Sequence, residues 1–429
     1  MKKKIALILA CCLLFALAAC ADSGVYIHDE PAVTLAPQTP EPEPVAEEPR
    51  PDIAAEIGAP VIVNVKRELE EKSAPDGSDQ TILTYGYDAV RVYLEGNPEA
   101  AEEINQYLAM QDELMRSGTV PGEGINAMLE LAYDNFGLAM DLGKGGNLEF
   151  SWMRSASIRR GDSKVLSVLY DIYSYTGGAH GESKDRAFVF DVETGSLLTI
   201  DDLFTDRDAL EQAMLDKMLG LIQSDVRYQT IQDYMTMFRP DDKLEDVLKS
   251  LFREGSWILD NDGFTVFSDI DEIGTYSDGI ISFTLGYDEM ADILHEEFLP
   301  PDRPEDGTLM LRALNDQASA GIALRDAVTV DANGTAFRLY AEGTIYDVSI
   351  DSVTYFSDHI GFYHQETHWF CSYLCDSGVQ IRTLIPAGMP NLMIRYTDSS
   401  GEEHSMLLTQ SGENGEVILL DKDNVTAVG

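Results

Sequence analysis

The chain has 429 residues, of which 44% are hydrophobic and 24% charged, and its formal net charge is −45. This length predicts two or three domains, and the apolar content is sufficient for hydrophobic cores. These values exclude a small protein that depends on disulfides for its stability. The acidic excess repels nucleic acid and other polyanions, and it attracts cationic partners or divalent cations or simply keeps the protein soluble.

The first residues read MKKKIALILACCLLFALAAC. A basic start is followed by an apolar run from Ile5 to Ala19, which is shorter than the about 20 residues of a membrane span. This profile is typical of a signal peptide over residues 1–19. Leu17-Ala18-Ala19-Cys20 fits the bacterial lipobox, so we expect cleavage before Cys20 and a lipid on its thiol. The alternative is an ordinary signal peptide in which the cysteine has no role.

Residues 20–60 are rich in proline, glutamate and alanine. Such a composition predicts an extended, disordered spacer. Behind a lipid anchor, this linker would hold the folded part away from the membrane. The protein is therefore expected at the extracytoplasmic face of the cell membrane, attached to it through lipid on Cys20.

Residues 61–299 mix strand-like and helix-like patterns without strict alternation, which predicts an α+β fold with subdomains over about 61–165 and 166–299. Asn97 and Pro98 mark a helix start, and Thr205 with Asp208 forms a capping-box pattern before a second helical stripe. Asp262-Gly263 indicates a hairpin turn. Strands are expected at 61–69, 80–94, 147–160, 163–175 and 279–287, hairpins at 187–204 and 258–267, and helices at 97–115, 126–140, after 205 and at 288–299.

A proline-rich boundary at 300–307 precedes a region of about seven short strands over 308–429. The turn signals Asn333-Gly334 and Asn414-Gly415 lie between such strands. This pattern predicts an all-β, immunoglobulin-like sandwich as a C-terminal domain.

The stretch HQETHWFCSYLC contains His364, His368, Cys371 and Cys375, all of which are metal-ligand types. On a helix they would share one stripe. On a strand, which the residue types favour, the histidines and the cysteines point to opposite faces. They are therefore weak metal candidates, and a local disulfide would need a bend in the chain. We find no G-x-S-x-G, H-E-x-x-H or P-loop motif, and we expect no cofactor.

The stretch YTGGAH, from Tyr175 to His180, follows a predicted strand. Its two glycines permit a positive φ or a close approach of another backbone. Together with DIY before it and with FVFDVETGSLLTIDDLF and DGFTVFSDIDEIGTYSDGIISFTLGYDEM after it, this motif resembles the extracytoplasmic part of RsiV-type anti-sigma factors and PdaC-associated proteins. The resemblance covers about Val61 to Leu299. At Asp271–Gly279 the chain departs from the family pattern.

The resemblance implies an extracytoplasmic binding domain, with a lysozyme receptor as the model. The candidate ligand contacts are Tyr175, Gly177, Gly178 and His180, and the alternative is a crowded bend in which His180 has a structural role. The cytoplasmic segment and transmembrane helix of the anti-sigma factors are replaced here by the lipobox, so their signalling is not expected. We predict a lipid-anchored, non-enzymatic binding protein for a peptidoglycan-associated ligand or for a cationic host protein such as lysozyme. The alternative is a cell-wall-modifying hydrolase that uses His180 with a carboxylate such as Asp171.

Overall fold

The structure is a computed structural model that describes residues 53–118, 124–141, 149–313, 323–356, 361–386, 390–410 and 417–422. At 140, 312, 313, 355, 356 and 361–365 only the backbone is described. The predicted signal peptide, Cys20, most of the predicted linker and the Asn414-Gly415 turn lie outside this part. Within it, no helix has the length and apolar character needed to cross a membrane.

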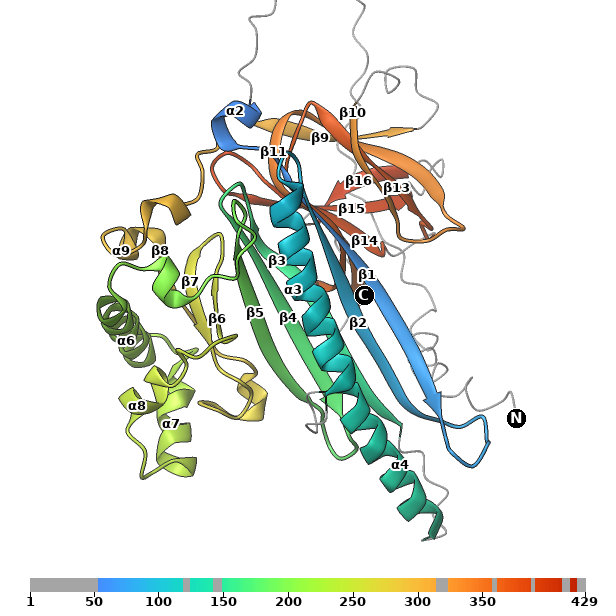
Figure 1. Ribbon diagram of the computed structural model, residues 1–429, viewed down its shortest axis with the longest axis vertical. Coiled ribbons are helices and arrows are strands. Elements are labelled where there is room, and N and C mark those ends of the chain that lie inside the picture. Colours follow the sequence, from blue (N-terminus) through green and yellow to red (C-terminus); the bar gives the residue numbers. More distant parts are fainter. Residues whose placement is uncertain are drawn as a thin grey trace, which may run out of the picture.

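A sheet of 13 strands forms the centre of the molecule (Figure 1), and its main path runs β16-β15-β14-β11-β12-β1-β2-β3-β4-β5. The strands are β1 (Val61–Ser73), β2 (Thr81–Leu94), β3 (Phe150–Gly161), β4 (Val165–Tyr175), β5 (Glu182–Asp191), β9 (Gly307–Ala313), β10 (Ala323–Thr329), β11 (Thr335–Phe356), β12 (Gly361–Cys375), β13 (Ser377–Thr383), β14 (Leu392–Thr397), β15 (Glu403–Gln410) and β16 (Val417–Asp421).

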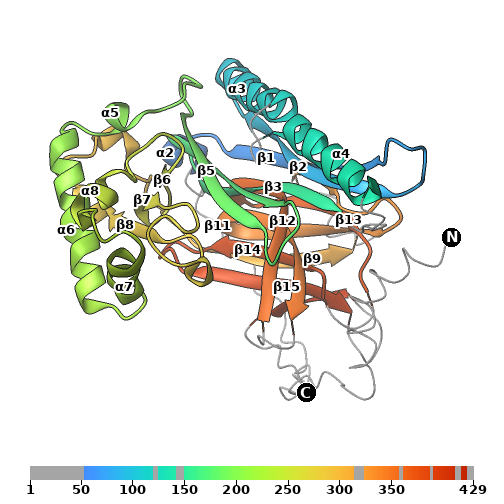
Figure 2. The same ribbon diagram turned by 90° about the horizontal axis from the view of Figure 1, so that it is seen from below.

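Helices and a second, three-stranded sheet surround this sheet. Figure 2 shows α3 and α4 on one side of strands β1–β5 and strands β14 and β15 on the other. The remaining elements are α2 (Ile53–Ile57), α3 (Pro98–Ser117), α4 (Ile125–Asp141), α5 (Ile200–Leu203), α6 (Arg207–Ser224), α7 (Gln229–Phe238), α8 (Leu244–Lys249), α9 (Tyr287–Met290), the 3-10 helices η1 (Tyr276–Asp278) and η2 (Glu296–Phe298), and the small sheet of β6 (Trp257–Leu259), β7 (Gly263–Phe267) and β8 (Ser282–Gly286).

Helix α3 is fixed to the sheet by its cap and by one buried amide. The side chain of Asn97 accepts a hydrogen bond from the backbone nitrogen of Ala100, as the sequence predicts for an N-cap. β3 pairs with β2 only along Leu83–Tyr87, so Val92 lies beyond that pairing. The buried Asn105 side chain accepts from Val92 N at 2.8 Å and donates to Val92 O at 2.9 Å. The amide thus satisfies both backbone groups of an otherwise open strand edge.

The helices α6, α7, α8 and α9 and the small sheet β6-β7-β8 form a subdomain next to β5 (Figure 1). Its apolar core, which includes Leu210, Met214 and Phe264, continues onto Ala187 and Val189 of β5. Two contacts join it to the edge of β5. Ala187 N donates to Gly255 O at 3.0 Å, and Leu198 N donates to Val189 O at 2.8 Å. These bonds cover part of an edge that would otherwise be open for pairing.

In the C-terminal region the chain bends sharply on two neighbouring strands at the same level. Gly343, with φ of +80°, divides β11 into a part paired with β9 and β13 and a part paired with β12 and β14. Asp376 lies between β12 and β13 and also has a positive φ. Gly343 N donates to Asp376 Oδ1 at 3.0 Å, and Asp376 N donates to Gly343 O at 3.1 Å. The chain therefore bends at Gly343 and at Asp376 together. At each bend it passes between the layer of β9, β10 and β13 and the layer of β12 and β14.

The C-terminal region is joined to the rest of the protein by strand pairing. β12 pairs with β1 in the register Val63 to Phe370, so one sheet continues through both predicted folded regions. The carboxylate of Asp347 also accepts hydrogen bonds from Arg303, Thr397 and Asn261 at 2.5, 2.8 and 3.2 Å. Arg303 thus attaches the proline-rich segment to β11 and β14.

The α+β class and the strand-rich C-terminal region are confirmed, whereas an immunoglobulin-like fold is not. The predicted helix at 288–299 is wrong, because α9 ends at Met290 and Leu294 forms a bridge with Phe204. Helix α6 is capped by Asp206 and not by Thr205. Helices α7 and α8 were not predicted from the sequence.

Candidate functional site

The YTGGAH stretch forms the turn between β4 and β5. Gly177 and Gly178 have φ of +92° and +107°, a conformation that costs a glycine little and other residues more. Tyr175 closes the turn by donating its hydroxyl to Gly178 O at 3.1 Å. The imidazole of His180 is exposed and stacks on Tyr276 of η1, with 3.8 Å between ring centroids. The turn is therefore a compact surface feature.

The glycine that follows the histidine has a packing role. A Cβ atom at Gly181 would lie 2.5 Å from the ring of Tyr173, which is too close for any real contact. Tyr173 in turn is half-buried, and burial raises the pKa of its phenol. The small residues of the turn therefore allow an aromatic cluster of Tyr173, His180 and Tyr276 to form at this end of the hairpin.

A cleft of about 630 Å³ lies along β5, between α3 and the helical subdomain. This volume is within the range of small-ligand sites, about 300–1,000 Å³. Its floor comes from β3, β4 and β5, and its two walls from α3 and from the segments before α6 and β6. The lining residues are Tyr107, Gln111, Leu114, Met115, Gly118, Trp152, Arg154, Tyr170, Ile172, Lys184, Arg186, Ala187, Phe188, Val189, Leu197, Leu198, Thr199, Ile200, Asp201, Arg207, Phe252, Glu254, Gly255 and Trp257.

Aromatic side chains meet across the cleft floor. Tyr107 of α3 packs edge-to-face on Phe188 of β5, with ring centroids 5.5 Å apart and planes at 69°. Tyr170 of β4 packs on the same Phe188 ring at 6.0 Å. Trp257 forms part of the opposite wall. Such edge-to-face pairs are favourable beyond the area they bury, so they give this part of the cleft a defined shape.

Three polar groups in the cleft floor have no hydrogen-bond partner among the described residues. They are the indole nitrogen of Trp152, Nε of Arg154 and the hydroxyl of Tyr170. The three residues are 0%, 4% and 1% exposed. A buried donor without a partner costs about 1–3 kcal/mol, and such groups are rare in native proteins. Their concentration at one cavity makes the cleft the candidate functional site.

The charge of Arg154 is balanced within the floor. Its guanidinium donates to the carboxylate of Asp112 on α3 and lies over the ring of Tyr170, 4.3 Å from the centroid. Burial raises the pKa of Asp112, and the neighbouring Arg154 opposes that rise. Burial also raises the pKa of Tyr170 strongly, so its phenol is neutral. The floor therefore presents an ion pair and neutral donors.

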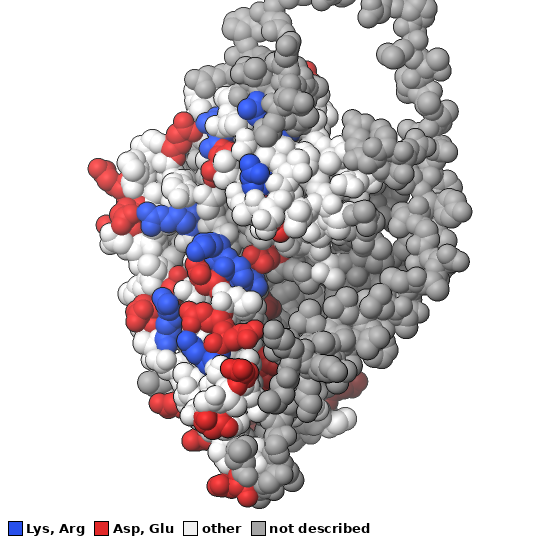
Figure 3. Space-filling model, turned by 90° about the vertical axis from the view of Figure 1, so that its right-hand side faces the viewer, with Lys and Arg blue, Asp and Glu red and all other residues white. Residues whose placement is uncertain are grey.

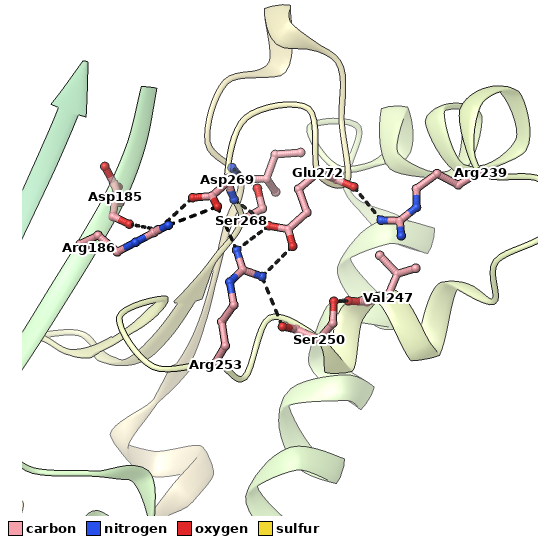
Figure 4. A network of polar contacts seen from close by, with 10 residues as sticks. Asp185, Arg186, Arg239, Val247, Ser250, Arg253, Ser268, Asp269 and Glu272 are labelled. Atoms are coloured by element: carbon pink, nitrogen blue, oxygen red, sulfur yellow. Dashed lines mark hydrogen bonds and ion pairs between the residues drawn. The ribbon is translucent and has the colours of Figure 1, made fainter. Parts of the chain in front are cut away.

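At the rim of the cleft, a polar network connects β5 with the loop before η1 (Figure 4). Arg186 donates to Asp269 at 3.0 Å, and Arg253 donates to Glu272 at 2.6 and 2.8 Å. Asp269 N also donates to Glu272 at 2.8 Å. This loop leads to Tyr276, on which His180 stacks. The turn with the sequence motif is thus linked to the cleft through the loop, although it does not line it.

Asp171 and Asp185 face each other across β4 and β5. Burial raises the pKa of Asp185 to about 7, and the negative charge of Asp171 adds to this rise. Asp171 itself is exposed. Neither carboxylate contacts His180 in any hydrogen bond or ion pair between described residues. The Asp171–His180 pair considered from the sequence is thus not assembled here, and the hydrolase alternative stays a prediction.

The two cysteines of β12 do not form the disulfide considered from the sequence. Cys371 is buried with a free thiol, burial raises its pKa to about 12, and Cys375 is also free. The described residues contain no group of three or more His, Cys, Asp or Glu arranged to hold a metal. The backbone of His364 pairs with Val353, and its side chain is outside the described part.

His368 instead interacts with two polar neighbours. Its Nε2 lies 2.6 Å from Oγ of Ser352, and its Nδ1 lies 3.5 Å from Oε1 of Glu366. This order resembles that of a Ser–His–acid triad. However, the Glu366 distance is at the limit of a hydrogen bond, and the cleft along β5 includes none of the three residues. We therefore regard the cluster as part of the sheet surface.

The chain was compared with known proteins. No protein-family model matches it, and no curated protein matches it. Among solved structures, a DUF3298 family protein from Pseudomonas aeruginosa covers 56% of this chain and 97% of its own, with 15% identity and a TM-score of 0.39. A DUF3298 family member from Bacteroides fragilis covers 55% and 94%, with 14% identity and a TM-score of 0.38. Similarity of this degree does not establish a shared function.

The sequence pointed to the turn and not to the cleft. The four candidate ligand contacts are neighbours in the chain and lie together in the turn, but none of them lines the cleft. They are Tyr175, Gly177, Gly178 and His180. The three residues with unpartnered donors lie on two strands, β3 and β4, and carry no motif. The available signal was a row of bulky side chains at alternate positions of a strand, which is equally typical of a core strand.

Proposed function

We propose that this protein is a lipid-anchored, extracytoplasmic binding protein that does no chemistry on its ligand and that holds a cell-wall-associated ligand in the cleft along β5. The observation that carries the proposal is the cleft itself, with its three unpartnered buried donors. The lining residues include no serine, cysteine or histidine, and therefore no nucleophile–histidine pair. This composition gives no support to acyl hydrolysis by a serine or cysteine nucleophile.

The resemblance of the YTGGAH region to RsiV-type domains supports an extracytoplasmic binding role. The acidic charge of −45 favours a second candidate ligand, a cationic host protein such as lysozyme. On the face shown in Figure 3, basic side chains lie among acidic ones, and acidic side chains predominate toward the lower end. A cationic protein would bind over such a surface with an affinity that falls as salt rises.

Binding can be tested with the full-length protein, purified in detergent and mixed with insoluble peptidoglycan or with lysozyme. We expect saturable co-sedimentation with peptidoglycan at physiological salt. Trp257→Phe in the cleft wall should weaken it, and His180→Ala in the exposed turn should not. Binding to lysozyme alone would select the second candidate ligand. Binding to neither would contradict the proposed function.

The lipid anchor can be tested separately in a bacterial host that processes lipoproteins. Cells fed radiolabelled palmitate should label the protein and retain it in the membrane fraction. Cys20→Ser should abolish the label and release the protein, whereas Cys12→Ser in the same segment should leave both unchanged. Label that persists in Cys20→Ser would contradict the predicted anchor.

A further inference from the structure

We infer that the cleft along β5 recognises an uncharged saccharide, so that a glycan and not a peptide or an ion is the bound part of the ligand. The inference rests on the proposed function and names the chemistry of its ligand. Three properties of the cleft carry it: the kind of unpaired group in its floor, the pairing of its arginines, and the aromatic side chains around it.

The unpaired groups call for hydrogen-bond acceptors. The indole nitrogen of Trp152 and Nε of Arg154 can only donate, and the Tyr170 hydroxyl can donate as well. All three atoms are shielded from solvent, so a ligand reaches them only after a neighbouring side chain moves. Gln111 and Met115 of α3 line the same cleft, and both have unbranched side chains that adopt several rotamers. A ligand rich in hydroxyl and carbonyl oxygens would then satisfy donors that are otherwise unpaired.

The arginines at the cleft are already paired with carboxylates, which disfavours an ionic ligand. Each of three arginines in the lining is paired: Arg154 with Asp112, Arg186 with Asp269, and Arg207 with Glu211 and Asp201. An anion would have to compete with these carboxylates, and a cation with the guanidinium groups. The overall charge of −45 adds a repulsive field for anions. An uncharged ligand avoids both costs.

Aromatic rings provide the remaining surface. Tyr107 and Phe188 pack at the floor, and Phe252 and Trp257 belong to the opposite wall. Rigid aromatic faces bury apolar area at little cost in side-chain entropy, and the C–H face of a sugar ring is a flat apolar surface of matching size. Flat apolar walls combined with N–H and O–H donors and with paired arginines fit a short oligosaccharide. A free ion would leave these walls uncovered.

The experiment uses the full-length protein in a detergent without a sugar head group, with the trimer of N-acetylglucosamine as probe. Titration calorimetry should show saturable binding with one site per chain, and tryptophan fluorescence should change because Trp152 and Trp257 line the cleft. Tyr170→Phe should weaken the affinity about fivefold or more, since one hydrogen bond is worth about 1 kcal/mol. The matched variant Tyr133→Phe, at an exposed position of α4, should leave it unchanged.

A short alanine peptide and acetate serve as competing probes. Absence of saturable binding by the trimer, or binding that Tyr170→Phe leaves unchanged, would overturn the inference. If intact peptidoglycan binds but the trimer does not and the peptide does, the proposed function stands and the ligand class is wrong. If neither peptidoglycan nor any probe binds, the inference and the cleft-based function both fail.

Discussion

The cleft floor on β3 and β4 and the buried cluster around Asp351 on β11 are both polar and both shielded from water, yet they are satisfied to different degrees. Asp351 is fully buried and accepts from Arg395, Thr367 and Ser349 at 2.7, 2.8 and 2.8 Å. In the cleft, three donors remain without a partner. A network in which every polar group has a hydrogen-bond partner stabilises a fold. Donors without a partner beside a cavity indicate a site where a ligand supplies the missing acceptors.

The largest expected effect comes from breaking the network around Asp351. Asp351→Ala removes the partner of three donors, including one arginine, and should lower the free energy of unfolding by about 3–5 kcal/mol. Urea denaturation of the full-length protein measures the loss. Asp233→Ala, at an exposed position of α7, should change it by less than about 0.5 kcal/mol. Equal effects of the two variants would contradict the role assigned to Asp351.

A smaller loss is expected at a second satisfied group, the buried amide of Asn105 that joins α3 to β2. Asn105→Ala leaves Val92 N and O without their bonds, and each unsatisfied group costs about 1–3 kcal/mol. We expect a destabilisation of about 2–3 kcal/mol. The neighbouring, exposed Gln106→Ala is the control, and hydrogen exchange at Val92 should rise only in Asn105→Ala. An unchanged exchange rate at Val92 would refute this account.

Asp185 makes the stability dependent on pH. Its pKa of about 7 in the fold lies above the ordinary value of 3.8. The fold therefore favours the protonated form, and this stabilisation is complete below about pH 4 and is lost as pH rises through about 7. Asp185→Asn should remove that loss and be more stable than the wild type at pH 8 by about 1–2 kcal/mol.

The control for this prediction is Glu182→Gln on the same strand, where the side chain is exposed. It should leave the difference in unfolding free energy between pH 5 and pH 8 unchanged. If Asp185→Asn shows the same difference as the wild type, the carboxylate is ionised throughout this range and the prediction is wrong.

The smallest effect on stability is expected at the unsatisfied network. Tyr170→Phe removes a hydroxyl that has no partner, so the unfolding free energy should stay within about 0.5 kcal/mol of wild type or rise slightly. Thermal unfolding without ligand measures this. A loss above about 1 kcal/mol would mean that the hydroxyl is paired in the protein, and the contrast with Asp351 would disappear.

Local patterns in the sequence determined most of the secondary structure. The cap formed by Asn97 and Pro98, the hairpin at Asp262-Gly263 and the strand-forming residue types of β1 to β4 depend on residues close in the chain, and the structure contains each of these elements. The same holds for the bend at Gly177-Gly178. The α+β class follows from these elements.

Tertiary structure decided the rest, because it depends on contacts between residues far apart in the sequence. Leu294 pairs with Phe204 instead of continuing a helix, and Val61 N bonds to Ser372 Oγ, so that β1 and β12 join one sheet. The cleft likewise combines strands, α3 and the helical subdomain. Local sequence patterns do not predict which buried donors form hydrogen bonds, because those bonds depend on how distant elements pack together.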